Sequence, residues 1–138
     1  MSEKQYFAHI GMHKTASTFL QNNVFPAFES IHYIKKHHYF KKDLIVKRSN
    51  SQKFLFTNEC ESSKESRLKS LHQQFPQSKI LLVLRRHDRW FESKYKYSIR
   101  KAETRTFTDY YNQWYRPGAP NEHELQFMNT ITLIEKYF

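Results

Sequence analysis

The run Ile80-Leu81-Leu82-Val83-Leu84 constrains the fold of this chain more than any other segment. Every position in the run is aliphatic, and the run is the longest of its kind in the chain. A strand that is apolar at every position suits the centre of a parallel sheet, where helices cover both faces. The run has five residues, far fewer than the roughly 20 that a helix needs to cross a bilayer. We therefore expect a buried, central parallel strand here.

Strand and helix patterns alternate around this run. Short β-prone segments precede it at residues 6–10, 31–34 and 53–57. Apolar residues at helical spacing predict helices from Thr18 to a kink or end at Pro26, over Leu68–Phe75, from Asp88 to Ile99, over Phe107–Trp114 and over Phe127–Phe138. The basic, His-rich stretch Lys35–Lys53 is interpreted as a surface loop. The alternation predicts an α/β fold, a three-layer sandwich with a central parallel sheet, in one domain over residues 1–138.

The composition restricts the partner and the compartment. Lys and Arg number 23 against 13 Asp and Glu, a formal charge of +10, which predicts a partner or substrate that carries phosphate, sulfate or carboxylate. The 12 Phe and 9 Tyr argue against a disordered basic tail. The single cysteine, Cys60, excludes an internal disulfide and a four-cysteine zinc site, and the His spacing matches no zinc pattern. We expect no metal, and, without a signal-type apolar stretch after Met1, a cytoplasmic protein.

Gly11-Met12-His13-Lys14-Thr15-Ala16-Ser17-Thr18 lies between the first predicted strand and the first predicted helix. Backbone N–H groups at a helix N-terminus attract anions, and here a Lys and three hydroxyl side chains are added to them. The segment therefore has the position and composition of a phosphate-binding loop. Its spacing is not that of a Walker A loop, which has a Gly directly before the Lys. The alternative is that Thr15 or Ser17 only caps the helix and Lys14 is solvated.

A second basic segment, Arg85-Arg86-His87-Asp88-Arg89, directly follows the aliphatic strand, and Ser93 follows Arg85 by eight residues. Ligands of open α/β sheets bind outside the carboxyl ends of the strands. An Arg at the strand end and a Ser two turns into the next helix can therefore converge on one phosphate. The alternative is that Arg85 pairs with a carboxylate and Ser93 is an ordinary surface residue.

Together the two segments resemble the sulfotransferase family that uses 3′-phosphoadenosine 5′-phosphosulfate, in its bacterial form. His9 to Leu20, with the core Gly-Met-His-Lys-Thr, is similar to the 5′-phosphosulfate loop. Leu82-Val83-Leu84-Arg85-Arg86 through Ser93 is similar to the 3′-phosphate motif, and the order of the two motifs also matches. The resemblance covers about residues 6–101. It implies a P-loop NTPase-like fold and an enzyme that transfers a sulfuryl group from this nucleotide to a hydroxyl or amine acceptor, such as a carbohydrate. The sequence shows no carboxylate pair beside the loop that could hold a metal, so we expect no metal requirement.

The resemblance also implies a set of site residues. The nucleotide-binding residues would be Gly11, His13, Lys14, Thr15, Ala16, Ser17, Thr18, Arg85 and Ser93. Lys14 would contact the phosphosulfate bridge, Thr15 to Thr18 would surround the 5′-phosphate, and Arg85 and Ser93 would hold the 3′-phosphate of the substrate and of its product, adenosine 3′,5′-bisphosphate. Glu59, after the third strand, would accept the acceptor's proton, with Glu61 near it. Ala16 stands where the family has Gly, so the loop must avoid a positive φ there or tolerate strain.

Three other functions stay open. A P-loop kinase-like protein is disfavoured by the Walker spacing. A non-catalytic polyanion or nucleic-acid binder is motivated by the interleaved Lys and aromatic residues of Tyr33–Lys42 and Lys94–Lys101. A fragment that folds without activity is the third.

The family runs well beyond this length, and the chain ends inside an apolar helical pattern. We expect this chain to be the nucleotide-binding half, truncated at its C-terminus and without the acceptor part. Phe127, Ile131, Ile134 and Phe138 would then be partly exposed or covered by another chain.

Overall fold

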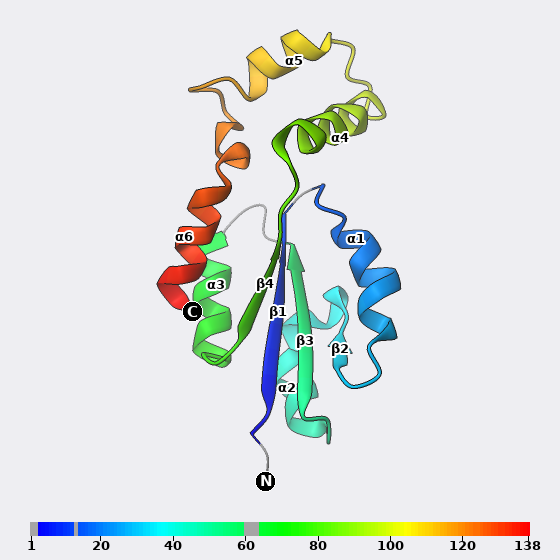
Figure 1. Ribbon diagram of the computed structural model, residues 1–138, viewed down its shortest axis with the longest axis vertical. Helices are drawn as coiled ribbons and strands as arrows, with labels where there is room; N and C mark the ends of the chain where they lie inside the picture. The colour runs from blue at the N-terminus through cyan, green and yellow to red at the C-terminus, as the bar shows by residue number, and fades with distance from the viewer. Residues whose placement is uncertain (1–2, 13, 60–63) are drawn as a thin grey trace.

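The computed structural model describes residues 3–12, 14–59 and 64–138. Its sheet consists of β1 (Gln5–Gly11), β2 (His32–Ile34), β3 (Lys53–Glu59) and β4 (Lys79–Val83). The strand order is β2-β3-β1-β4, and all three pairings are parallel. The predicted α/β fold with a parallel sheet is confirmed (Figure 1).

In the described residues, six α-helices and several 3₁₀ or π-helical segments connect and follow the strands. They are α1 (Ser17–Phe19), which continues as a π-helical segment (Leu20–Val24) and a 3₁₀ turn (Phe25–Ala27), α2 (Lys42–Arg48) after a 3₁₀ segment (Lys36–Lys41), α3 (Lys64–Gln74), α4 (His87–Ile99), α5 (Phe107–Trp114) and, after a 3₁₀ turn (Glu122–Leu125), α6 (Phe127–Tyr137). None of the helices in the described ranges is both long and apolar enough to span a membrane.

One face of the sheet carries the main core. Ala8 and Ile10 of β1 and Phe54 and Phe56 of β3 point to this face, because alternate residues of a strand share a side. They form one buried cluster with residues of α2 and α3, and α6 packs against its margin. The buried members are Ala8, Ile10, Ile34, Val46, Phe54, Phe56, Leu68, Leu71 and Phe75. Figure 1 shows α3 and α6 on the side of the sheet opposite α1.

The opposite face is covered by α1 and its continuation. The ring of buried His9, in β1, lies 5.1 Å from the ring of Phe25, and Gln21 Nε2 donates a hydrogen bond to Thr57 Oγ1 at 3.1 Å. Helical segments therefore cover both faces, as expected for a three-layer sandwich.

Two sequence-based predictions about the fold are wrong, one about β4 and one about residues 35–53. The aliphatic strand β4 is at the end of the strand order, and among the described residues it pairs with β1 alone. Leu81 and Leu84 are accordingly 44% and 45% exposed, so an unbroken aliphatic run does not by itself establish a central position. The stretch Lys35–Lys53 contains α2 rather than only a loop, and Val46 is buried in the core. The sequence did not predict α2 because its apolar residues are too few to show a helical period.

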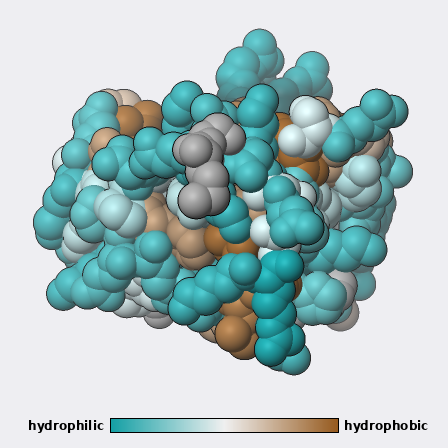
Figure 2. Space-filling view, turned by 90° about the horizontal axis from the view of Figure 1, so that it is seen from below, coloured by the Kyte–Doolittle hydropathy of each residue, from teal (hydrophilic) through white to brown (hydrophobic). Residues whose placement is uncertain are grey.

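A second core lies beyond the carboxyl ends of the strands. It consists of Met12, Trp90, Phe91, Tyr110, Tyr115 and Phe127. These residues join α4, α5 and the start of α6 to the loop after β1, and Figure 1 shows α4 and α5 beyond the upper end of the sheet. The molecule's other end, where the strands begin, is mainly hydrophilic (Figure 2).

The last helix is exposed to different degrees along its length. Phe127 is buried in the second core, whereas Ile131 and Ile134 are half-buried and Phe138 is 36% exposed. The expected partial exposure is thus found at three of the four positions, and Phe127 is the exception.

Candidate phosphate-binding site

The strand order and the placement of the helices predict a ligand site at the carboxyl end of β1. The connection that leaves β1 contains α1, on one face of the sheet, and the connection from β3 to β4 contains α3, on the other face. β1 lies between β3 and β4. A reversal of this kind opens a crevice at the carboxyl ends of the strands, where open α/β sheets bind ligands. The loop after β1 borders this crevice, and the segment after β4 starts beside that loop, because Gly11 and Val83 are paired in register.

The loop after β1 has an unusual backbone. Lys14 and Ala16 have φ values of 60° and 62°, in the left-handed region, and Ala16 is the residue before α1. For residues with a Cβ this conformation costs about 1–2 kcal/mol each, and such strain is concentrated at functional sites. The chain therefore tolerates strain at the position where the resembled family has Gly. Gly11 itself belongs to β1 and is not among the residues with positive φ.

Two hydroxyl side chains of the loop hold its shape. Thr15 is 2% exposed, and its Oγ1 donates a hydrogen bond to the carbonyl oxygen of Met12 at 2.7 Å. The Ser17 hydroxyl is also buried and lies 3.5 Å from Thr15 Oγ1. Thr18, by contrast, is exposed. The predicted residue His13 lies outside the described residues.

The two predicted motifs meet across the crevice. Arg85 Nη1 donates a hydrogen bond to the carbonyl oxygen of Lys14 at 3.1 Å. Lys14, Arg85 and Ser93 line one pocket of about 190 Å³. The structure thus brings together three of the side chains that the family resemblance assigns to nucleotide binding.

Three further residues of α4 line the same pocket; they lie in the run Lys94–Lys101, but the two motifs do not include them. Lys96, Tyr97 and Arg100 follow Ser93 by three, four and seven residues, so they share one face of α4. Their helical spacing from Ser93 is the sequence signal that could have predicted their place beside it. The Lys14 ammonium lies 3.9 Å from the centre of the Tyr97 ring, a cation–π contact.

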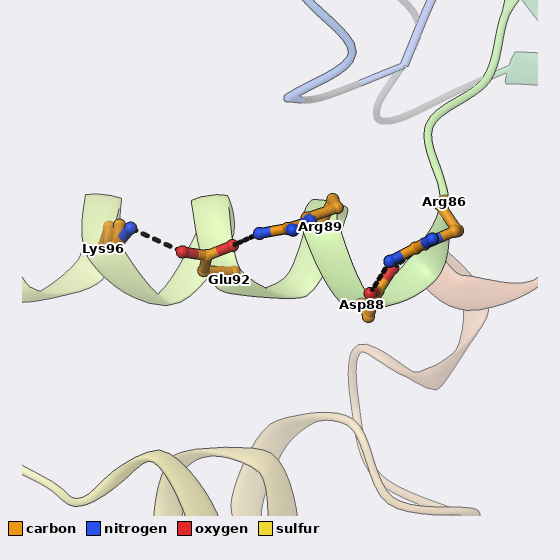
Figure 3. A network of polar contacts seen from close by, with 5 residues as sticks. All are labelled: Arg86, Asp88, Arg89, Glu92 and Lys96. Atoms are coloured by element: carbon orange, nitrogen blue, oxygen red, sulfur yellow. Dashed lines mark hydrogen bonds and ion pairs between the residues drawn. The ribbon is translucent and has the colours of Figure 1, made fainter.

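Among the described residues that line the pocket, Glu92 is the one carboxylate, and it already accepts hydrogen bonds from two cations. It accepts hydrogen bonds from Lys96 Nζ at 2.6 Å and from Arg89 Nη1 at 3.2 Å (Figure 3). These bonds, that of Lys96 first, lower the pKa of Glu92, so it is ionised at neutral pH. Four cationic side chains then face one carboxylate, and the pocket is suited to an anion.

Arg86 differs from its neighbour Arg85. Both ends of its guanidinium bond the Asp88 carboxylate, at 2.7 and 2.5 Å, in the first turn of α4 (Figure 3). This pairing holds the pKa of Asp88 well below its usual range. Of the two arginines after β4, Arg85 is therefore the one that reaches the loop.

The predicted base Glu59 ends β3, and its backbone is paired in register with Gly11. Its backbone thus lies beside the start of the loop; its side chain is outside the described part of the structure. Among the described residues no group of three or more His, Cys, Asp or Glu gathers as metal ligands do.

Comparisons of this chain with protein-family models, with curated proteins and with solved structures found no match.

Proposed function

We propose that this chain binds 3′-phosphoadenosine 5′-phosphosulfate and acts in sulfuryl transfer from this nucleotide to a hydroxyl or amine acceptor. The observation that carries the proposal is the hydrogen bond from Arg85 to the Lys14 carbonyl oxygen, beside a cationic pocket that both residues share with Ser93. Each motif taken alone has an ordinary structural explanation. Their meeting at the carboxyl ends of neighbouring strands supports a ligand with two anionic groups, one near each motif.

The two ends of the ligand would be held by different groups. The backbone of the strained loop and the start of α1 would bind the 5′-phosphate. Arg85 would offer two N–H groups to oxygens of the 3′-phosphate, with a further bond from the Ser93 hydroxyl. The pocket volume of about 190 Å³ is below the roughly 300 Å³ of typical small-molecule sites, so the pocket would take a phosphate and leave the adenosine outside it.

Catalysis would consist of positioning and charge stabilisation, as in phosphoryl transfer. The acceptor oxygen or nitrogen forms a bond to sulfur in line with the bridging oxygen. The bond from sulfur to that oxygen breaks, its electron pair stays on the departing 5′-phosphate, and the Lys14 ammonium offsets the charge that develops there. The acceptor's proton passes to Glu59.

Calorimetry with three nucleotides tests the proposal. Adenosine 3′,5′-bisphosphate should bind at least tenfold more tightly than ADP or ATP, since only the bisphosphate offers a phosphate to Arg85 and Ser93. An Arg86→Ala variant is the matched control and should keep this preference, because Arg86 is committed to Asp88. Equal or tighter binding of ATP would contradict the proposal and favour a kinase-like protein.

A further inference from the structure

We propose that a second pocket, between α4 and α5, binds a negatively charged sugar ring. We call it the α4–α5 pocket. It has a volume of about 390 Å³ and is lined by the last turns of α4, residues 101–105, α5 and residues 115 and 121. Figure 1 shows α5 lying across the far side of α4 from the sheet. The volume is within the roughly 300–1,000 Å³ of ligand sites.

Charge in the pocket favours a ligand with one anionic group. Lys94 pairs with Glu124 at 2.9 Å, and Arg105 pairs with Glu103 at 3.3 Å. Lys101 also lines the pocket and forms no ion pair with any described residue. One positive charge is therefore left for a ligand carboxylate or sulfate.

Aromatic rings and hydrogen-bonding groups also line this pocket. Tyr97 is 38% exposed, and Trp114 is half-buried, with the Arg105 guanidinium 5.8 Å from its ring centre. Such rings can pack against the C–H face of a pyranose. Asn121 and Thr104 line the same pocket, and their side-chain amide and hydroxyl are groups that can bond sugar hydroxyls. Together, partly exposed rings, neutral polar groups and one cation without an ion pair to a described residue fit a hexuronate better than a neutral sugar.

Tyr97 joins this pocket to the phosphate-binding site. Its ring lines both pockets, with the Lys14 ammonium 3.9 Å from the ring centre and the Lys101 ammonium 5.7 Å from it. A ring hydroxyl of a bound hexuronate is thereby brought toward the group that Lys14 would contact. The binding site stands on its own contacts, whereas its role as the acceptor site rests on the proposed function.

The test compares 4-nitrophenyl β-D-glucuronide with 4-nitrophenyl β-D-glucoside, which differ only at C6, a carboxylate in the first and a hydroxymethyl group in the second. The glucuronide should bind about tenfold more tightly, as expected for one charge-assisted hydrogen bond. Lys101→Gln should remove this preference and leave glucoside affinity unchanged. Trp114→Leu should weaken both glycosides, provided that it melts at the parent's temperature. Lys69→Gln, an exposed lysine of α3, is the control and should change neither.

The outcomes separate this inference from the proposed function. Equal affinity for the two glycosides, or an unchanged preference in Lys101→Gln, would overturn the inference. So would binding of the oligonucleotide dT8 that displaces the glucuronide, because a nucleic-acid surface would then explain the pocket. Adenosine 3′,5′-bisphosphate is titrated into the same samples. Its tight binding without glucuronide binding contradicts only the sugar site, and the reverse result contradicts only the nucleotide proposal.

Discussion

Arg85 Nη1 donates a hydrogen bond at 3.1 Å to the carbonyl oxygen of Lys14, a residue 71 positions earlier in the chain. A guanidinium has five N–H donors, so this bond leaves most of them for a ligand. The bond also fixes the loop after β1 relative to the segment after β4. The same arginine can therefore shape the site and bind in it, and the predictions below separate these two effects.

The strain at Ala16 predicts a stabilising substitution. Ala16→Gly should raise the free energy of unfolding by roughly 0.5–1 kcal/mol, because the relief of left-handed strain exceeds the entropy that Gly adds to the unfolded chain. Urea denaturation measures the change. Ala102, with φ 67° and outside the loop, is the matched site, and Ala102→Gly should give a similar gain. A loss of stability in Ala16→Gly alone would show that the loop does not adopt this backbone.

The loop should also depend on its buried anchor Met12. This side chain is 5% exposed and packs in the second core with Trp90. Met12→Ala should lower the free energy of unfolding by about 2–5 kcal/mol, the usual cost of such a cavity. Met128→Ala is the control: Met128 is 67% exposed, and its loss should change stability by less than about 0.5 kcal/mol. Equal effects of the two substitutions would contradict the packing described for the loop.

Local patterns were sufficient to predict the elements that form the site. Gly11 ends β1, α4 begins within one residue of the predicted Asp88, and Arg85 and Ser93 lie where a strand end and the next helix should place them. The start and end of a helix or strand depend on residues that are close in sequence, and the spacing of apolar residues reflects these local preferences.

Features that depend on the whole fold could not be predicted in this way. The edge position of β4 depends on which strands pair with it, and a run of aliphatic residues carries no such information. The bond from Arg85 to the Lys14 carbonyl leaves no side-chain pattern, since its acceptor is backbone. The α4–α5 pocket requires the relative placement of two helices, which periodicity within either one does not give.

Arg86 should lower the pKa of Asp88 and should not contribute to nucleotide affinity. Asp88 in the unfolded chain titrates near pH 3.9, and its folded pKa is lower, first because Arg86 donates hydrogen bonds to it. The pair therefore stabilises the fold above about pH 4 and loses this effect as the pH falls through the folded pKa. Arg86→Ala should raise the pKa of Asp88 toward its ordinary value in a carboxyl-carbon NMR titration, and Arg89→Ala should do so far less. An unmoved pKa in Arg86→Ala would contradict the pairing.

Lys14 should act on turnover more than on product binding. Lys14→Ala should lower sulfuryl transfer by about 10²–10³, the usual cost of removing one group that stabilises developing charge. Its affinity for adenosine 3′,5′-bisphosphate should fall by less than tenfold, because this product lacks the sulfuryl group. Transfer assays measure the rate of sulfuryl transfer, and calorimetry on the same variant measures its affinity for the bisphosphate. Equal losses in both would assign Lys14 to ground-state binding.

The most direct test of the central claim is the affinity of the parent and of Arg85→Ala for adenosine 3′,5′-bisphosphate and for adenosine 5′-phosphate. The two ligands differ only in the 3′-phosphate. A charge-assisted hydrogen bond contributes about 1.5–3 kcal/mol, so Arg85→Ala should lower bisphosphate affinity at least tenfold more than monophosphate affinity. Ser93→Ala should show the same selectivity with a smaller loss. Equal weakening of both ligands in Arg85→Ala would mean that Arg85 acts only by holding the Lys14 loop, and it would contradict the 3′-phosphate site.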